Sequence, residues 1–207
     1  MIRVWRIPFS TNVERVALAL GHKELEVEWV DVPVRDRAAV VELSGQPLVP
    51  VLQDGAAVVA DSTAILEYLE ERHPDPPLYP RDEARRAEAT LLIDWFNRVW
   101  KKAPNELDRM LDPEERVEAR VRAQAEELRR SRDRFEALLA DRPYMLGEDF
   151  GAVDCAFFPF LKYGVLEVDP EDTEPFHGIL ADHLALDGGH PRLEAWIHRV
   201  DAHPRAE

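Results

Sequence analysis

The run from Val49 to Leu69 constrains the fold and the function of this chain more than any other segment. It holds an apolar stretch at 49–52, an Asp-Gly pair, and a second apolar stretch at 56–60. An Asp-Gly pair between two apolar stretches predicts a β-hairpin. Because Pro50 has no N–H to donate, the first strand must begin or expose an edge there. The backbone of Val49 is then free to pair with a ligand.

Asp61 and Ser62 follow this hairpin and precede an expected helix over 62–72, which stops at His73-Pro74. The first N–H groups of a helix lack partners, so Ser62 would cap them or help them hold a ligand carboxylate. Asp61 would accept an ammonium group. A plain helix cap is the alternative interpretation of this pair, but the preceding hairpin favours a site for a small peptide-like anion.

The composition excludes several classes of protein. A formal charge of −15 argues against binding to nucleic acid or to an anionic membrane surface, since both need clustered Lys and Arg. We expect neither a membrane span nor a signal peptide, and the cytoplasm is the expected location. The single cysteine, Cys155, forbids an internal disulfide and any paired-cysteine redox or zinc site.

The first eighty residues alternate between strand and helix patterns, which predicts a β-α-β-α-β-β-α order. The expected elements are an extended segment at 2–7, a helix at 12–20, an extended segment at 25–30 and a weak helix at 37–43, followed by the hairpin and helix described above. The proline-rich segment 73–80 is a stiff linker, and we place the domain boundary there.

Beyond the linker the pattern is helical. Asp82 is expected to cap a helix whose apolar stripe is Leu91, Leu92, Trp95, Phe96 and Val99. A second helix is expected to start at Asp112-Pro113, with a buried face of Val117, Val121, Leu128, Phe135, Leu138 and Leu139. An almost wholly apolar helix should run from Val153 toward Lys162, and a last one should start at Pro191.

Three spaced motifs resemble the cytosolic glutathione transferase family. They are the segment from Val49 to Pro74, the turn Pro8-Phe9-Ser10-Thr11-Asn12 with the helix after it, and the pair of segments 144–147 and 152–154. The turn is similar to the serine-type active site, most like that of the phi class. The resemblance implies an α/β plus all-α fold, with a thioredoxin-like glutathione-binding domain at 1–80 and an all-helical domain at 88–207. It also implies a cis bond before Pro50.

The resemblance assigns Ser10 as the catalytic residue, which would stabilise the thiolate of glutathione. Only the thiolate attacks an electrophile, and a free thiol with a pKa of about 8.5 is mostly protonated at neutral pH. Ser10 lies where a first strand meets a first helix, so a hydroxyl, a helix dipole and backbone N–H groups could converge on one sulfur. Simple capping of the helix by Ser10 or Thr11 is the alternative.

Glutathione itself would be bound by Phe9, Val49, Pro50, Asp61 and Ser62. The family usually places Lys or Gln before the cis-proline region to bind the glycyl carboxylate, whereas this chain has Leu48 there. Gln46, Arg35 or Arg37 would have to replace that partner.

The small hydrophobic electrophile would lie against Trp95, Arg98, Val99 and Tyr163. Plain core packing for Trp95 and Val99, and a solvated face for Arg98, are the alternatives.

His177, His183 and His190 accompany Asp172, Asp182 and Asp187, but their spacings match no pattern of metal ligands.

We expect glutathione as co-substrate, no metal, a homodimer, and no nucleic-acid or membrane partner. The expected activity is that of a glutathione S-transferase. The alternatives are a non-catalytic scaffold or regulatory protein of the same fold, and a glutathione-dependent peroxidase, isomerase or dehalogenase.

Overall fold

The structure is a computed structural model that describes residues 1–206, and its contacts divide the chain into two units. The first unit comprises Met1–Arg86 together with the segment from His203 onward, and the second comprises Ala87–Ala202. The sequence predicted domains at 1–80 and 88–207. The segment from His203 packs with the first unit, although it follows the last helix of the second.

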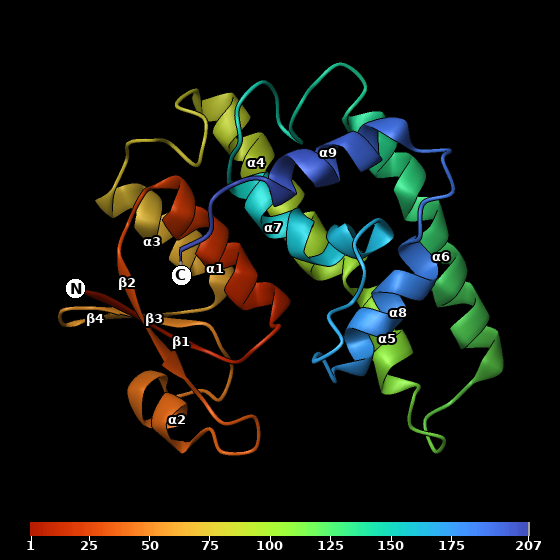
Figure 1. Cartoon of the computed structure of the whole chain (residues 1–207), viewed down its shortest axis with the longest axis horizontal. Helices are drawn as coiled ribbons and strands as arrows, with labels where there is room; N and C mark the ends of the chain where they lie inside the picture. The colour runs from red at the N-terminus through yellow and green to blue at the C-terminus, as the bar shows by residue number, and fades with distance from the viewer. Residues whose placement is uncertain (207) are drawn as a thin grey trace. The chain divides into compact units, whose positions relative to one another are not determined.

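The first unit is a four-stranded sheet with three helices, as predicted (Figure 1). Its elements are β1 (Ile2–Arg6), α1 (Thr11–His22), β2 (Val27–Asp31), α2 (Ala38–Ser44), β3 (Val51–Asp54), β4 (Ala57–Ala60) and α3 (Ser62–Arg72). The strand order is β2-β1-β3-β4; β1 is parallel to β2 and antiparallel to β3, which is antiparallel to β4. This is the thioredoxin-like fold expected from the sequence.

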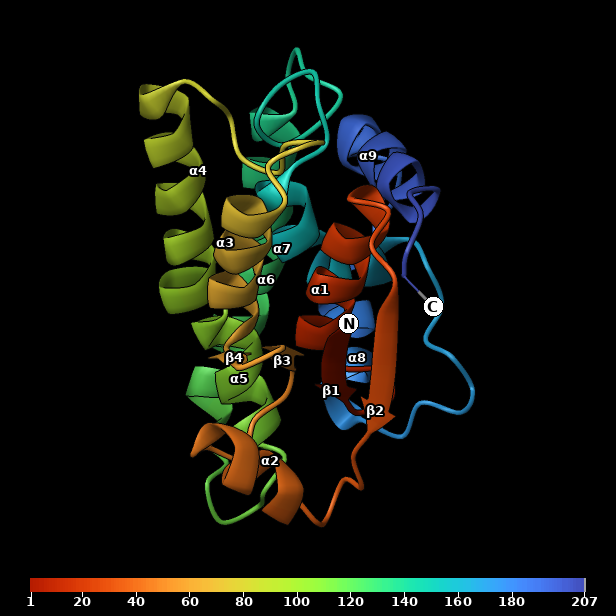
Figure 2. The same ribbon diagram turned by 90° about the vertical axis from the view of Figure 1, so that its left-hand side faces the viewer.

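The sheet separates two apolar layers. α1 and α3 lie side by side on one face, and α2 lies on the other (Figures 1 and 2). Val40 of α2 packs in a buried cluster with Val32 and Val51, while the alternating residues Val4 and Leu52 are fully buried and point to the opposite face. β1 and β3 therefore contribute to both layers, since Trp5 and Val51 pack on one face and Val4 and Leu52 on the other.

A buried ion pair ties the linker to the first unit. Lys23 Nζ lies 2.9 Å from Glu70 Oε2, and it also donates to the carbonyl groups of His73 and Pro76. The same carboxylate accepts the N–H groups of Leu78 and Tyr79. These bonds fix the course of the predicted linker after α3 by satisfying its backbone groups.

The second unit is helical. Its elements are the later part of α4 (Glu83–Trp95), the π-helix η1 (Phe96–Trp100), α5 (Lys102–Arg109), α6 (Glu118–Leu138), α7 (Ala152–Leu161), the 3₁₀ turn η2 (Lys162–Gly164), α8 (Pro175–Leu184) and α9 (Pro191–Asp201). The predictions for α7 and α9 are confirmed. α5 and α8 were not predicted.

Two helix predictions need correction. Asp112 does not start α6; its carboxylate accepts the N–H of Glu114 in a separate turn, and the helix begins at Glu118. The predicted stripe on α4 is also partly wrong, because Leu91 and Val99 are 70% and 53% exposed. The π-helix after Trp95 adds a residue to one turn and changes which side chains face inward. Phe96 of the predicted stripe is buried, and Ile93 and Trp100, which were not in the stripe, are buried as well.

Aromatic rings fill the core of the second unit. Phe96 stacks between Trp100 and Phe157, with ring centroids 4.3 Å apart in both pairs. Every residue of α7 is buried, as its apolar sequence predicted. Asp154 is the polar exception, and it accepts hydrogen bonds from the backbone of Met145 and Gly151 and from Trp196 Nε1. Burial raises the pKa of Asp154 to about 6.

Among residues 1–206, no helix is both long and apolar enough to cross a bilayer.

Candidate thiol-binding site

The connections that carry the predicted site residues converge at one edge of the sheet. β1, β2 and β4 all end there, and β3 begins there, because Val51 pairs with both Trp5 and Ala60. Figure 2 shows β2 pointing toward this edge, which lies at the α2 end of the sheet. The topology therefore brings together four segments that are far apart in sequence: 7–10 after β1, 32–37 after β2, 48–50 before β3 and 61–62 after β4.

Ser10 is the N-cap of α1, and it is partly exposed. Its Oγ accepts a long hydrogen bond, 3.4 Å, from the N–H of Val13. The capping interpretation and the catalytic interpretation are compatible, because capping uses an oxygen lone pair and leaves the hydroxyl proton to donate. The positive end of the α1 dipole, with Ser10 at its cap, thus lies at the edge where β1 ends.

Phe9 directly precedes Ser10 after β1, and Pro50 directly precedes β3, the strand that pairs with β1. Phe9 has φ of 60° and is 39% exposed, a conformation that a bulky residue rarely adopts. The bond between Val49 and Pro50 is cis, as predicted. Pro50 is buried, and Val49 is half-buried. The strand β3 starts one residue later at Val51, so the backbone of Val49 lies outside the ladder.

Asp61 supplies the side-chain cap of α3, whereas the sequence predicted that Ser62 would cap it. Asp61 Oδ1 accepts the N–H groups of Thr63 at 2.8 Å and Ala64 at 3.3 Å, with φ of 80°. The residue is exposed, so its carboxylate also faces solvent. Asp is a preferred cap because its short side chain reaches the N–H groups of the first turn.

Ser62 has a partner that the sequence did not indicate. Its Oγ lies 3.3 Å from Nη1 of Arg15, and the two residues are 3% and 1% exposed. Arg15 lies on α1, and nothing in its local sequence distinguishes it from a solvated helix residue. The buried cation is placed beside the candidate anion-binding end of α3, where it favours negative charge.

The turn before the cis-proline does not offer a free polar side chain. The amide of Gln46 donates to Ser44 Oγ and the carbonyl of Leu48, and it accepts the N–H of Leu48. Leu48 itself is 73% exposed. Segment 32–37 carries two cations. Arg35 is exposed, and Arg37 donates through Nε to the carbonyl of Val34. Of the three candidate replacements for the missing partner, Gln46 is already engaged.

The residues predicted to bind an electrophile lie in or next to the second unit's π-helix and in η2. Trp95 contacts Phe135 and Phe157, with centroids at 6.1 and 6.5 Å. Arg98 forms an exposed ion pair with Asp94. Tyr163 is buried and stacks on His177 at 5.1 Å. The exposed members of the set are Arg98 and Val99.

The three histidines near the acidic loop have separate partners. His177 contacts Asp172, His190 contacts Asp133, and His183 lies 3.4 Å from Arg129. Within residues 1–206, no group of three or more potential ligands is arranged to hold a metal ion.

Family models match both parts of the chain. The glutathione S-transferase N-terminal domain matches residues 5–77, and the glutathione S-transferase C-terminal domain matches residues 118–199. The first match contains every segment at the candidate edge.

Individual relatives agree with these matches. Glutathione S-transferase GstB of Escherichia coli (strain K12) is 31% identical over 170 residues, which cover 78% of this chain and 82% of the relative. FtsZ-localized protein A of Caulobacter vibrioides is 32% identical over 167 residues, covering 72% and 71%. The theta class glutathione S-transferase of Xanthomonas axonopodis pv. citri, solved with glutathione bound, has a TM-score of 0.72 at 25% identity, covering 97% of this chain and 92% of its own. The chain therefore belongs to the glutathione S-transferase family.

Proposed function

We propose that this protein is a serine-type glutathione transferase, most like the phi class in its active-site turn, that activates the thiol of glutathione for attack on a small hydrophobic electrophile. The order of groups along the candidate edge carries the proposal. From β2 to β4 it runs from the cations of 32–37, through Ser10 and the Val49–Pro50 backbone, to Asp61 and Ser62. A peptide with a carboxylate at one end, a thiol in the middle and an ammonium at the other matches this order.

The dimensions support the same arrangement. Adjacent strands lie about 4.8 Å apart, so three strand intervals separate the two ends of the row by about 14 Å. Three extended residues span at most about 11 Å, and a γ-glutamyl linkage adds backbone atoms to that length. Arg35 and Asp61, at the two ends of the row, are both exposed and can meet a ligand from solvent. A tripeptide can therefore contact the whole row, whereas a single amino acid cannot.

At the γ-glutamyl end, Asp61 supplies a carboxylate for the ammonium group, and Ser62 supplies a hydroxyl for the carboxylate. Ser62 Oγ accepts from Arg15, so its own proton remains to donate. The charge of Arg15 lies behind that hydroxyl and favours the anionic group.

In the middle of the ligand, the backbone of Val49 would pair with the cysteinyl residue, as in strand addition to an open edge. Phe9, which is 39% exposed, would supply an apolar surface that shields the sulfur from water. The hydroxyl proton of Ser10 would donate to the thiolate. Lowering the pKa of the thiol by about 2 units requires about 2.7 kcal/mol of preferential stabilisation, which one charge-assisted hydrogen bond and a helix N-terminus supply together.

At the glycyl end, we assign the carboxylate to the cations of segment 32–37. Gln46 is engaged within its own turn, and Leu48 has no polar group. Arg35 is exposed, and the Nη1 atom of Arg37 is buried without a hydrogen-bond acceptor. A ligand carboxylate would give this guanidinium group the acceptor it lacks.

The reaction then follows from the thiolate. Its lone pair forms a carbon–sulfur bond with the electrophile, and either a leaving group departs with the bonding electrons or the adduct takes a proton from water. Val99 and Arg98 offer an exposed apolar and cationic surface for the electrophile, and Trp95 and Tyr163 complete the proposed set. No metal is required for these steps.

One alternative has support of its own. FtsZ-localized protein A is similar over most of this chain, and its name describes a location rather than a reaction. The exposed Leu48 at the usual carboxylate position fits a member that has lost ligand binding. A scaffold or regulatory role is therefore the second candidate, ahead of a peroxidase, isomerase or dehalogenase activity on the same fold.

Retention on immobilised glutathione separates the two candidates, and a panel of electrophilic substrates then tests the reaction. We expect retention, and a rate with at least one electrophile that falls about 100-fold in Ser10→Ala, consistent with the loss of about 2.7 kcal/mol. Equal rates in both proteins would remove Ser10 from the mechanism. We also propose that the protein acts in the cytoplasm and that it is a homodimer; sedimentation of the purified protein tests the dimer.

A further inference from the structure

The segment that follows α9 runs beside α1, the helix that begins at Ser10 (Figures 1 and 2). It contacts α1 at three levels. Arg205 reaches the first turn, where its Nε and Nη2 atoms lie 3.2 Å from Glu14 Oε1. The N–H of Ala206 donates to the carbonyl of Ala17 in the middle of the helix, at 3.0 Å.

The third contact is the close approach of the backbone of Pro204 and Arg205 to Gly21. A Cβ atom on Gly21 would lie 2.3 Å from the carbonyl oxygen of Pro204 and 2.8 Å from the Cα of Arg205. These are backbone atoms, so no side-chain rotation relieves the overlap. Gly21 weakens the last turn of α1, and the close approach of residues 204–205 is a physical reason for its presence.

We propose that residues 203–206 form a strap that positions α1, and through Glu14 positions Ser10, for thiol binding in the first unit. This inference rests on the proposed function. Glu14 is one turn from Ser10 and donates its N–H to the carbonyl of Ser10 at 3.0 Å. The strap therefore acts on the turn that carries the hydroxyl.

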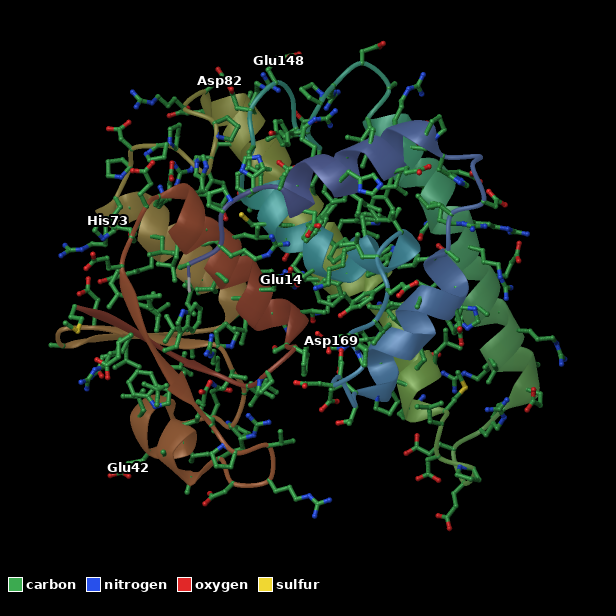
Figure 3. The ribbon with its side chains drawn as sticks, viewed as in Figure 1. Glu14, Glu42, His73, Asp82, Glu148 and Asp169 are labelled. Atoms are coloured by element: carbon green, nitrogen blue, oxygen red, sulfur yellow. The ribbon has the colours of Figure 1, made fainter. Side chains whose placement is uncertain are left out.

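The strap also has an electrostatic role. Glu14 lies in the first turn of α1, one turn from Ser10, so its charge acts within a Debye length on a thiolate held by Ser10. An uncompensated negative charge there would disfavour the thiolate. Arg205 pairs with that carboxylate in a partly buried setting, with side chains 28% and 16% exposed (Glu14 is labelled in Figure 3). Arg205 is thus a positioning residue that does not itself touch the ligand.

The structural part of the proposal is tested without any ligand. We compare the full chain with a variant ending at Ala202, each with Gly21 and with Gly21→Ala. In the full chain Gly21→Ala should lower the thermal midpoint by about 5 °C, because the added methyl group overlaps the strap. In the shortened chain it should raise the midpoint by about 2 °C, because Ala is the better helix residue. The same sign in both backgrounds would overturn the strap.

Hydrogen exchange gives a second structural measurement. Arg205→Ala should speed exchange of the amides of α1 about tenfold, while Arg130→Ala, which removes an exposed ion pair with Glu126, should not. Unchanged exchange in Arg205→Ala would contradict the strap even if the shortened chain failed to fold.

The functional part is measured on bound glutathione. Arg205→Ala should raise the pKa of the bound thiol by about half a unit, and Glu14→Gln in the same chain should reverse that shift. Faster exchange of α1 with an unchanged thiol pKa would overturn the positioning role. If the unmodified protein bound no glutathione, the proposed function would fail, and the exchange of α1 would still decide the strap.

Discussion

Arg15 Nη1 lies 3.3 Å from Ser62 Oγ, and this buried hydrogen bond joins α1 to the first residue of α3. α1 begins after Ser10, which is assigned to the thiol of the ligand, and α3 begins after Asp61, which is assigned to its ammonium group. A cation at this junction both stabilises the first unit and favours an anionic ligand. Substitution of Ser62 tests the effect on the ligand.

Ser62→Ala should weaken glutathione binding about tenfold, through loss of a hydrogen bond worth about 1.4 kcal/mol. The pKa of the bound thiol should not change, because Ser62 is assigned to the γ-glutamyl carboxylate rather than to the sulfur. Calorimetric titration and thiolate absorbance measure the two quantities on the same sample. A large shift of the thiol pKa in Ser62→Ala would contradict the assigned orientation of the ligand.

Asp61→Asn tests the ammonium site with little structural change. Asn caps helices as well as Asp does and tolerates the positive φ of this position, so the thermal midpoint should fall by no more than about 2 °C. The negative charge is lost, and glutathione affinity should fall about tenfold. Asp61→Ala is the matched comparison, because it loses the cap as well as the charge. Equal affinity in Asp61→Asn and the unmodified protein would exclude Asp61 from binding.

The pair of Lys23 and Glu70 predicts a stability effect away from the site. Lys23→Met leaves a buried carboxylate without its cation and should reduce the free energy of unfolding by about 3–5 kcal/mol. Glu70→Gln keeps an acceptor for the linker N–H groups and should reduce it less. Chemical denaturation measures both. If Glu70→Gln reduced the free energy of unfolding more than Lys23→Met, the hydrogen bonds to the linker would contribute more to stability than the ion pair.

Asp154 predicts a pH dependence of stability. Its pKa is raised from the ordinary 3.8 to about 6 by burial, so the folded state binds a proton that the unfolded state releases between these values. The contribution of Asp154 to stability therefore falls as pH rises from about 4 to 6, by about 3 kcal/mol in total.

Asp154→Asn removes that titration while keeping an oxygen for Met145 and Trp196. The difference in unfolding free energy between the two proteins should change by about 3 kcal/mol between pH 4 and pH 7, in favour of Asn as pH rises. Burial lowers the pKa values of His22 and His203, which opposes the trend, but both proteins share these histidines. A pH-independent difference would contradict the raised pKa.

The elements of the first unit were predictable because its apolar residues follow the periods of strands and helices. The segment 62–72 is α3 to the residue, and the cis bond before Pro50 followed from the resemblance. The second unit was less predictable. The π-helix at 96–100 shifts the buried face of α4. No local sequence pattern predicts this π-helix, because it depends on packing among Phe96, Trp100 and Phe157.

The candidate site shows a similar division. Ser10, Pro50 and Asp61 occupy positions with local signals: a strand end, an edge proline and a helix start. Arg15 and Arg205 have no such signal, because their roles come from contacts with residues distant in sequence. That Asp61 rather than Ser62 caps α3 could not be predicted either, since both residue types cap helices equally well.

The ultraviolet absorbance of glutathione thiolate, measured against pH on the bound ligand, tests the central claim most directly. If the hydroxyl of Ser10 stabilises the thiolate, bound glutathione should titrate about 2 units below the free value of about 8.5, and Ser10→Ala should restore most of that difference. Titration of the bound thiol near 8.5 in the unmodified protein would contradict the account, because the site would then bind the peptide without activating its sulfur.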